Sequence, residues 1–560
     1  MKEGFEWWSK LGSPQYGGEM AIRSATNPTN FDPYNSDHIT QIYSAWLERL
    51  FSEDWTLDPR IYDYGSVPLK QFLKGHLAES WEFTNPNTFV VHLRKGIHWQ
   101  AIPPVNGREF NADDVIYHYH RLYGLGSSFH TPAPYHATVV PFHSLTSVSS
   151  LDKYTVEFKW KTGNPELITE TMITVHSPTA AIEAHEIVDN WGDLNDWHHA
   201  IGTGPFILKD FVQGESAILV KNPNYWGHDE RYPHNKLPYI DTLKIIVMPD
   251  NNKALEALLA GKIDVMDGIS FRQALALKRS NPEILQTIHP NSANTIDPRN
   301  DVKPFIDIRV RKAMQMALDL GSIARIYYDN TVAPYPSSLT SRYMTGWAWP
   351  YEEWPQDLKD EYIYNPIAAK NLLSDAGYPS GFATNLVTDA LDDIGLLQMV
   401  KYYFAQVGID MEIRLMESAA LINFVQAAQK HDQLVFRSGG GALGSGQEPL
   451  RQLTRFQTGS SANPQLMISD PIMDNFYPAA LAAKNENEVK KIFQNANEYV
   501  ARQHFAISLL QPMKYSLSQP WLKGYNGQFG SISRSPQSLS FYASRFWIDP
   551  NLKSSMNHEQ

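Results

Sequence analysis

The stretch of sequence that decides the fold begins Leu77-Ala78-Glu79-Ser80-Trp81-Glu82 and continues with Thr88-Phe89-Val90-Val91-His92-Leu93-Arg94-Lys95-Gly96-Ile97-His98-Trp99. Its two halves are rich in the aromatic and β-branched residues that favour strands. Asn85-Pro86-Asn87 between them is typical of a turn. The segment therefore predicts a β-hairpin made of Trp81–Phe83 and Thr88–Leu93.

Outward from the hairpin, helices and strands are mixed along the whole chain. Asn111 is placed to cap a helix that ends at Leu122, and Asp37 is placed to cap one that runs to about Leu50. The spacing of apolar residues predicts further helices at 307–318, 366–376, 421–430 and 486–503, and strands at 20–26, 154–160, 243–248 and 433–436. This mixture predicts an α/β fold with mixed sheets.

Composition excludes several classes of protein. The 560 residues carry 48 Lys and Arg against 60 Asp and Glu, a formal charge of −12. Without a basic tract, that charge argues against nucleic acid and anionic membrane surfaces as partners. No apolar run reaches the roughly 18 residues of a membrane-spanning helix. The absence of cysteine excludes disulfides, thiolate metal sites and a cysteine nucleophile.

Motifs for catalysis or metal binding are weak. His118 and His120 point to different faces of their predicted helix, the adjacent histidines at 198 and 199 do not converge, and neither H-E-x-x-H nor G-x-S-x-G occurs. Carboxylates at 389, 392 and 393 are expected in a charged loop, with glycosidic acid–base chemistry as the less favoured alternative. We therefore expect no metal, no cofactor and no enzymatic activity, and a carbohydrate- or nucleotide-active enzyme is the competing class.

A glycine run, Gly439-Gly440-Gly441-Ala442-Leu443-Gly444, formally matches G-x-G-x-x-G after a short strand. Polar residues separate it from that strand, and no acidic residue follows at the distance that ribose binding needs. A glycine loop that lets the backbone approach a ligand closely is favoured over a nucleotide site, and a flexible turn is the remaining alternative.

Three indoles occur within eight residues, at Trp347, Trp349 and Trp354, and Pro350 interrupts them. Three indoles in a segment interrupted by proline are not expected to lie together on one buried face. The segment could form a stacking wall for a sugar, a heterocycle or a hydrophobic side chain. The alternative is packing between domains by a long loop, and the sequence leaves both open.

Several blocks together resemble one family, the extracytoplasmic solute-binding proteins of ABC importers, of the dipeptide/oligopeptide-binding type (family 5). The hairpin segment resembles the family's "LAESW" opening and its "LRKG" end. The other blocks follow in the family's order: Phe110–Val115, Gly202-Thr203-Gly204-Pro205-Phe206, Asn222-Pro223-Asn224-Tyr225-Trp226, Leu237–Asp241, Gly261–Asp264, Phe305–Ala313 and Leu372–Pro379. The resemblance covers roughly residues 18–530.

The resemblance implies a periplasmic-binding-protein-like fold of two lobes that close on a ligand about a hinge. By segment order, the first lobe would take residues 1–48, 185–270 and 505–560, with an inserted subdomain at 49–184, and the second lobe would take 271–504. It also implies secretion to the periplasm or the outer face of the cell membrane, as a monomer that docks on a permease. Family members usually carry a lipid on an N-terminal cysteine, so the absence of cysteine fits a mature form that lacks the anchor and the signal peptide.

One departure bears on the ligand. Peptide-binding members usually carry "G-W-G-A-D-Y", whose aspartate holds the peptide ammonium, whereas here Leu443 stands at the place of the acid. We therefore expect an aromatic, sugar-like or carboxylated solute in an inter-lobe cleft, with a di- or oligopeptide as the alternative. By segment order, the resemblance implies ligand contacts from Tyr34, His38, Phe271, Arg272, Trp347, Trp349, Arg437, Gly439, Gly440, Gly441 and Gln511.

Overall fold

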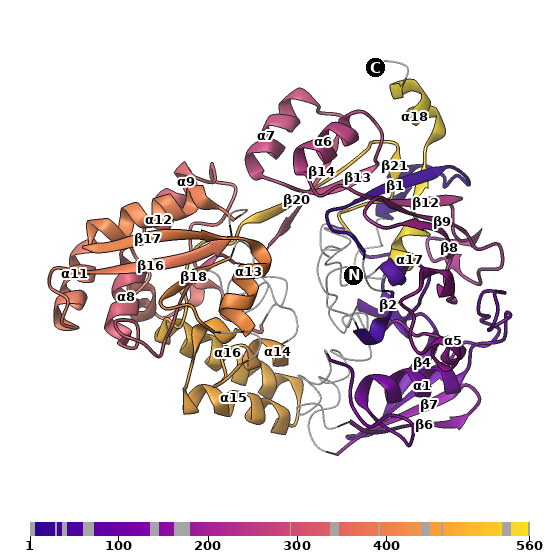
Figure 1. Ribbon diagram of the computed structural model, residues 1–560, viewed down its shortest axis with the longest axis horizontal. Helices are drawn as coiled ribbons and strands as arrows, with labels where there is room; N and C mark the ends of the chain where they lie inside the picture. Colours follow the sequence, from indigo (N-terminus) through magenta and orange to yellow (C-terminus); the bar gives the residue numbers. More distant parts are fainter. Residues whose placement is uncertain are drawn as a thin grey trace. The chain divides into compact units, whose positions relative to one another are not determined.

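The chain forms two compact units in the computed structural model (Figure 1): unit 1 is Met1–His289 with Lys514–Gln560, and unit 2 is Pro290–Met513. The structure describes residues 6–28, 31–35, 42–59, 72–134, 145–161, 180–291, 293–336, 346–389, 392–427, 429–437, 449–460, 463–528 and 539–557. Among these residues, no helix combines the length and hydropathy needed to cross a membrane. The predicted division into lobes and an inserted subdomain stays a prediction.

The larger sheet of unit 1 has seven strands, in the order β14 (Leu285–Pro290), β20 (Met513–Ser518), β13 (Val265–Ile269), β1 (Glu19–Ser24), β12 (Thr242–Val247), β9 (Ser216–Lys221) and β8 (Phe206–Val212). β1 runs parallel to β12 and β13, while β9 is antiparallel to β12 and β20 is antiparallel to β13. Helix α6 (Asn251–Leu259) packs on β13, and α7 (Phe271–Ser280) follows that strand. The sheet is therefore mixed, as expected.

A second sheet of unit 1 contains the hairpin. Its antiparallel order is β4 (Ala78–Asn85), β5 (Thr88–Leu93), β7 (Thr155–Trp160) and β6 (Leu145–Asp152), and α1 (Ala112–Tyr123) packs against β6 and β7. The smaller elements of unit 1 are β2 (Phe51–Glu53), β3 (Leu73–Gly75), β10 (His228–Asp229), β11 (Tyr232–Lys236), β21 (Leu522–Lys523), β22 (Trp547–Ile548), α5 (His185–Trp191), α17 (Leu539–Ala543) and α18 (Pro550–Asn557).

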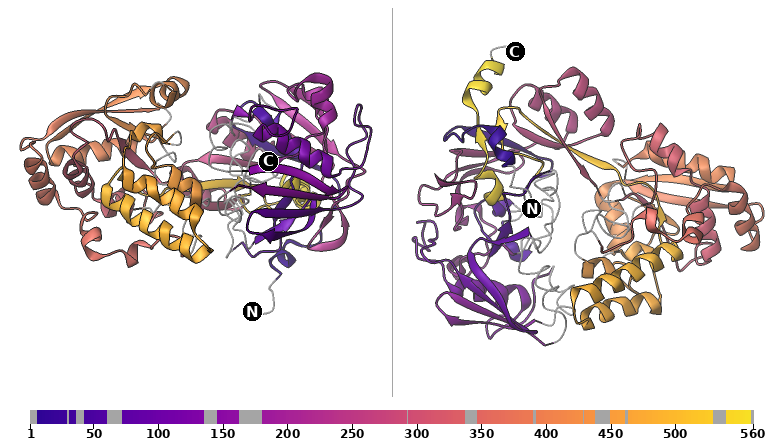
Figure 2. Two further views of the ribbon diagram at one scale, coloured as in Figure 1. Left: turned by 90° about the horizontal axis from the view of Figure 1, so that it is seen from below. Right: turned by 180° about the vertical axis from the view of Figure 1, so that it is seen from behind.

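Unit 2 has a five-stranded sheet in the order β17 (Ile409–Met416), β16 (Phe382–Asp389), β18 (Leu434–Phe436), β15 (Thr295–Pro298) and β19 (Ile507–Ser508). Figure 2 shows its helices, with α15 and α16 side by side. The helices are α8 (Ile308–Met316), α9 (Leu320–Ile326), α10 (Gln356–Asp360), α11 (Pro366–Asp375), α12 (Ile394–Gln406), α13 (Ser418–Ile422), α14 (Pro449–Thr454), α15 (Pro471–Ala482) and α16 (Glu486–Gln503).

Several local predictions are confirmed. β4 and β5 form the antiparallel hairpin, and the predicted helix at 486–503 is α16. The side chain of Asn111 accepts a hydrogen bond from the backbone N–H of Asp113 at 2.7 Å, and the carboxylate of Asp114 accepts one from the N–H of Asn111 at 3.0 Å. This reciprocal pair is a capping box, which satisfies donors that the first helical turn leaves free.

The prediction of an α-helix from Asp37 to about Leu50 is wrong for its described part. Ile42–Ala45 forms only a 3₁₀-helix, and residues 46–50 are not helical. Their carbonyls bond to distant segments instead: that of Trp46 accepts from Gly204 at 2.9 Å, and that of Leu50 accepts from His76 at 2.8 Å. Tertiary hydrogen bonds have replaced the local helical ones, although the apolar spacing suited a helix.

The glycines of the Gly202-Thr203-Gly204 block permit this close approach. A Cβ on Gly202 would lie 1.9 Å from the carbonyl oxygen of Trp46, and one on Gly204 would lie 2.6 Å from the same atom. No side chain fits at those distances, so the block is glycine because another backbone passes directly against it.

The chain passes between the units twice, between His289 and Pro290 and between Met513 and Lys514. The two crossing segments bond to each other. Asn291 donates its backbone N–H to the carbonyl of Pro512 at 2.9 Å, and Asn294 and Leu509 are joined by an N–H to carbonyl bond of 3.0 Å. The connection is therefore a two-stranded ribbon that continues β14 and β20 at one end and meets β15 and β19 at the other.

Candidate functional site

Tyr34 lies in a short 3₁₀-helix of unit 1, Pro33–Asn35, and is half-buried. Its backbone N–H donates to Oδ1 of Asp32 at 3.0 Å. The guanidinium carbon of Arg121 lies 4.7 Å from the centre of its ring, in the geometry of a cation–π contact. Tyr34 is thus held at the surface of unit 1 by a buried charged group.

That charged group is a buried cluster beneath Tyr34. Arg121 donates to both oxygens of Asp32, at 2.8 and 2.6 Å, and to Oε1 of Glu183 at 3.1 Å. His118 is hydrogen-bonded to the other oxygen of Glu183. Burial raises the pKa of Glu183, but the charge and hydrogen bond of His118 and the charge of Arg121 lower it more, to about 2. Glu183 therefore stays ionised and fixes its partners.

Phe271 and Arg272 open helix α7 in unit 1. Ser270 caps the helix, since its hydroxyl accepts from the N–H of Gln273 at 3.2 Å and the side chain of Gln273 accepts from the N–H of Ser270 at 3.0 Å. The guanidinium carbon of Arg272 lies 5.5 Å from the ring centre of Phe271. These two predicted residues are in contact, at a well-defined helix start.

The three tryptophans of the Trp347–Trp354 segment differ in exposure. Trp347 is 7% exposed and Trp354 is 6% exposed, whereas Trp349 is 39% exposed. Trp347 packs edge-to-face on Phe493 of α16 with ring centres 6.0 Å apart, and Trp354 donates its indole N–H to the carbonyl of Trp349 at 3.0 Å. Two indoles thus pack within unit 2, and Trp349 is the one with an exposed ring. A role for Trp347 or Trp349 in ligand binding stays a prediction.

Arg437 directly follows β18 and is half-buried in unit 2. His38 and the predicted glycine contacts Gly439, Gly440 and Gly441 lie outside the described residues. Gln511 is part of the crossing ribbon, where its side-chain amide donates to the carbonyl of Asn291 at 2.9 Å. Gln511 thus joins the two strands of the ribbon, and its contact with a ligand stays a prediction.

The residues considered as candidates for catalysis or metal binding form hydrogen bonds within the fold. Asp392 accepts from the hydroxyl of Thr388 at 2.8 Å and from the N–H of Asp389 at 3.0 Å, and Asp393 caps α12. His120 is bonded to the carbonyl of Val148 at 2.9 Å. In the described ranges, no group of three or more His, Cys, Asp or Glu could hold a metal ion.

Comparison with known proteins decides the family. The family model described as bacterial extracellular solute-binding proteins, family 5, matches residues 73–462, which is more than half of the chain. The chain is a family 5 solute-binding protein. Its family, its mixed α/β fold and its role as a substrate-binding protein of ABC transport, predicted from the sequence blocks, are confirmed.

Relatives of this family 5 solute-binding protein span almost its whole length. The glutathione-binding protein GsiB of Shigella flexneri is 23% identical over 523 residues, which cover 90% of this chain and 91% of GsiB. The periplasmic binding protein DppA of Helicobacter pylori, solved with the peptide STSA, is 19% identical, with a TM-score of 0.71 over 95% of this chain and 98% of DppA. AgaA of A. tumefaciens R10, solved with agropinic acid, is 16% identical, with a TM-score of 0.70 over 95% of this chain and 99% of AgaA.

The family 5 solute-binding protein also has a pocket of about 710 Å³ that lies wholly in unit 1 and contains none of the predicted residues. Trp226, which forms one of its walls, lies inside a family block of the sequence and is not among the predicted ligand contacts. A signal was present: Tyr225 and Trp226 are adjacent rings that each carry a polar atom, and such residues usually find a buried partner. Which partner they would find was not readable from the sequence.

Proposed function

We propose that this family 5 solute-binding protein captures a carboxylated, aromatic or sugar-like organic solute and delivers it to the permease of an ABC transporter. One observation carries the choice of ligand: Leu443 stands where peptide-binding members have the aspartate that holds the peptide ammonium. A buried ammonium without a counter-charge is costly, by several kcal/mol. A peptide held by its N-terminus is therefore disfavoured.

Two side chains support a ligand of this kind. Arg437, at the end of β18 and just before the glycine run, offers a guanidinium that matches a carboxylate in a bidentate way. Trp349 offers an exposed indole in unit 2. An acid and a planar or sugar ring are the groups that these two side chains recognise.

The proposed mechanism is closure about the crossing ribbon. The units are joined by only two segments, bonded to each other between Asn291 and Pro512 and between Asn294 and Leu509. A ribbon of this kind can absorb small changes in backbone angles while each unit keeps its own sheet. The solute would favour the closed state by contacting residues of both units, because a ligand shifts such an equilibrium only through differential contacts.

A peptide ligand is the second candidate. It is supported by the peptide in the solved structure of DppA and by the name of GsiB, which binds glutathione. In this case the peptide would be anchored by groups other than an acid at position 443.

A thermal-unfolding screen separates the candidates. The panel contains di- and tripeptides, glutathione, oligosaccharides, aromatic acids and osmolytes, each added to the purified protein. A bound solute stabilises the folded state by about 2.7 kcal/mol at one hundred times its Kd. We expect a carboxylated or aromatic solute to raise the Tm most. Stabilisation by peptides above every other class would overturn the proposal and select the second candidate.

Matched variants then test the recognition. Arg437→Gln should weaken binding of a carboxylated solute at least tenfold, whereas Arg414→Gln, which removes an exposed charge of unit 2 paired with Glu412 at 2.7 Å, should leave it unchanged. Equal affinities of the two variants would exclude Arg437 as a ligand contact. The bound solute should be recovered chemically unchanged after incubation, and release of a reaction product would favour the enzyme class instead.

A further inference from the structure

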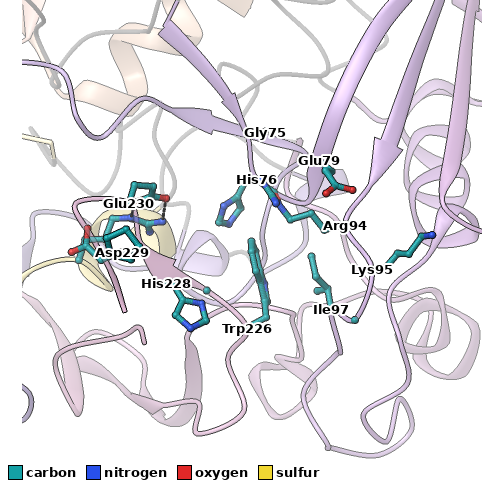
Figure 3. A pocket seen from close by; sticks show the side chains of 14 residues that line it. Gly75, His76, Glu79, Arg94, Lys95, Ile97, Trp226, His228, Asp229 and Glu230 are labelled. Atoms are coloured by element: carbon teal, nitrogen blue, oxygen red, sulfur yellow. Dashed lines mark hydrogen bonds and ion pairs between the residues drawn. The ribbon is translucent and has the colours of Figure 1, made fainter. Parts of the chain in front are cut away.

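The pocket of unit 1 is built from segments that are far apart in the sequence (Figure 3). Its lining comes from the end of β3 and the start of β4, the loop after β5, residues of the segment 226–233 that contains β10 and the start of β11, and Arg545. Its volume of about 710 Å³ falls in the range of small-molecule sites, roughly 300–1,000 Å³. All its residues belong to unit 1, so it is complete without unit 2.

One wall of the pocket is fixed by a buried carboxylate. Glu48, which is 0% exposed, accepts hydrogen bonds from the indole Nε1 of Trp226 at 3.0 Å, from the hydroxyl of Tyr225 at 2.7 Å and from Nε2 of His76 at 2.7 Å. The rings of His76 and Trp226 also pack on each other, with centres 5.1 Å apart. Because its polar atom is already bonded, Trp226 presents only its apolar ring to a ligand.

Arg94 supplies a positive group at the same place. Its Nε donates to the carbonyl of His76 at 2.7 Å, which orients the guanidinium and leaves its two terminal nitrogens for another acceptor. Among the described residues Arg94 forms no ion pair, and two of the three acids that line the pocket are engaged elsewhere. Asp229 pairs with Arg231 at 2.9 Å, and Glu230 pairs with Arg545 at 2.5 Å.

The positions of the remaining charged side chains decide which ligand charge the pocket favours. Lys95 points away from Trp226, as Figure 3 shows, and its ammonium lies 5.4 Å from the ring centre of Tyr154. Glu79 extends from β4 at the pocket rim, exposed to solvent. The half-buried, oriented and unneutralised group of the pocket is therefore the guanidinium of Arg94, which selects an anion with two oxygens in one plane.

We infer that this pocket is a second binding site of the protein, for a small aromatic carboxylate. The carboxylate accepts hydrogen bonds from the terminal nitrogens of Arg94, and the aromatic ring lies against Trp226. The rigid wall lowers the cost of binding because Trp226 and His76 are already held in place by Glu48. The site does not depend on the proposed function, since no residue of unit 2 takes part.

The test uses the full-length protein and phenylacetate as the probe, with binding followed by ligand-observed NMR titration. Phenethylamine, which has the same ring and a positive group, is the matched negative probe. We expect saturable binding of phenylacetate and none of phenethylamine. Arg94→Gln should weaken phenylacetate binding at least tenfold, and Arg94→Lys should weaken it less because the charge remains.

Lys74→Gln is the control, because it removes a positive charge from β3 without touching the pocket lining. The side chain of Lys74 is 61% exposed and pairs with Asp54 at 3.3 Å. This variant should bind phenylacetate like the parent. Arg94 variants that unfold at the parental temperature and still bind phenylacetate as tightly as the parent would overturn the inference, and so would equal binding of phenethylamine. The solute identified in the thermal screen should still stabilise Arg94→Gln, so failure here is distinguishable from failure of the proposed function.

Discussion

Trp226 in unit 1 and Trp347 in unit 2 both lie in short segments rich in aromatic residues, yet different forces hold them. Trp226 is bonded to a buried carboxylate that is 178 positions away in the chain, whereas Trp347 packs edge-to-face on Phe493 with the ammonium of Lys490 5.5 Å from its ring centre. The first indole depends on one buried charge, and the second depends on apolar burial. The interaction that holds an aromatic segment in place therefore cannot be read from the sequence of that segment alone.

The largest effect is expected for Glu48→Gln, which removes the charge that holds Trp226. The substitution keeps the volume but places an amide where three donors converge, so at least one donor loses its acceptor. We expect unfolding free energy to fall by about 3–5 kcal/mol, as for a broken buried pair. Chemical denaturation followed by a probe in unit 1 measures it. Glu82→Gln on β4, whose side chain is 62% exposed, is the control and should change stability by less than about 0.5 kcal/mol.

Trp347→Ala tests the apolar packing that holds the tryptophan segment of unit 2. Removing a buried indole from its packing on Phe493 should cost about 3 kcal/mol, from lost burial and the cavity left behind. Trp347→Phe should recover most of the loss because an aromatic ring remains. If Trp347→Ala were as stable as the parent, apolar packing would not be what holds this segment.

Acid should act on the Trp226 wall through Glu48. Burial raises the pKa of Glu48, but the charge of His76 and the hydrogen bonds of His76, Trp226 and Tyr225 lower it more, so that the folded pKa lies below its usual value. The contribution of the carboxylate is then present above the unfolded pKa and is lost as pH falls through the folded one. The stability difference between the parent and Glu48→Gln should therefore shrink from pH 6 to pH 3. A difference that is constant over this range would contradict the account.

The smallest effect is expected at Trp349. Its ring is 39% exposed, so Trp349→Ala should change the unfolding free energy by less than about 1 kcal/mol. Under the proposed function, the same substitution should weaken solute binding. Isothermal titration with the solute from the thermal screen, alongside an unfolding curve, separates the two effects. Unchanged affinity would remove Trp349 from the ligand contacts.

The local part of the fold was predictable because its determinants are neighbours in the chain. Asn111 and Asp114 form a capping box three residues apart, and the hairpin of β4 and β5 is closed by its own turn. The helix expected up to Leu50 failed because its carbonyls bond to residues near 76 and 204. No local pattern encodes such distant partners.

The same contrast between local and distant determinants applies to the candidate binding residues. Phe271 and Arg272 were selected by segment order. They are neighbours in the chain that open α7, and their contact with a ligand stays a prediction. The pocket of unit 1 was missed because Glu48, His76, Arg94 and Trp226 come from four separate segments, each unremarkable on its own. Only the tertiary structure shows that the carboxylate of Glu48 accepts hydrogen bonds from His76, Tyr225 and Trp226.

The position of β20 has a consequence for synthesis. β20, at Met513–Ser518, lies between β14 and β13 in the sheet of unit 1, while unit 2 is a single continuous stretch that ends at Met513. A chain that emerges N-terminus first contains all of unit 2 before it contains the strand that closes this sheet. Until then, β13 and β14 each keep an open edge that invites pairing with another chain. The strand that covers these edges is therefore made only after all of unit 2, and its arrival removes the open edges of β13 and β14.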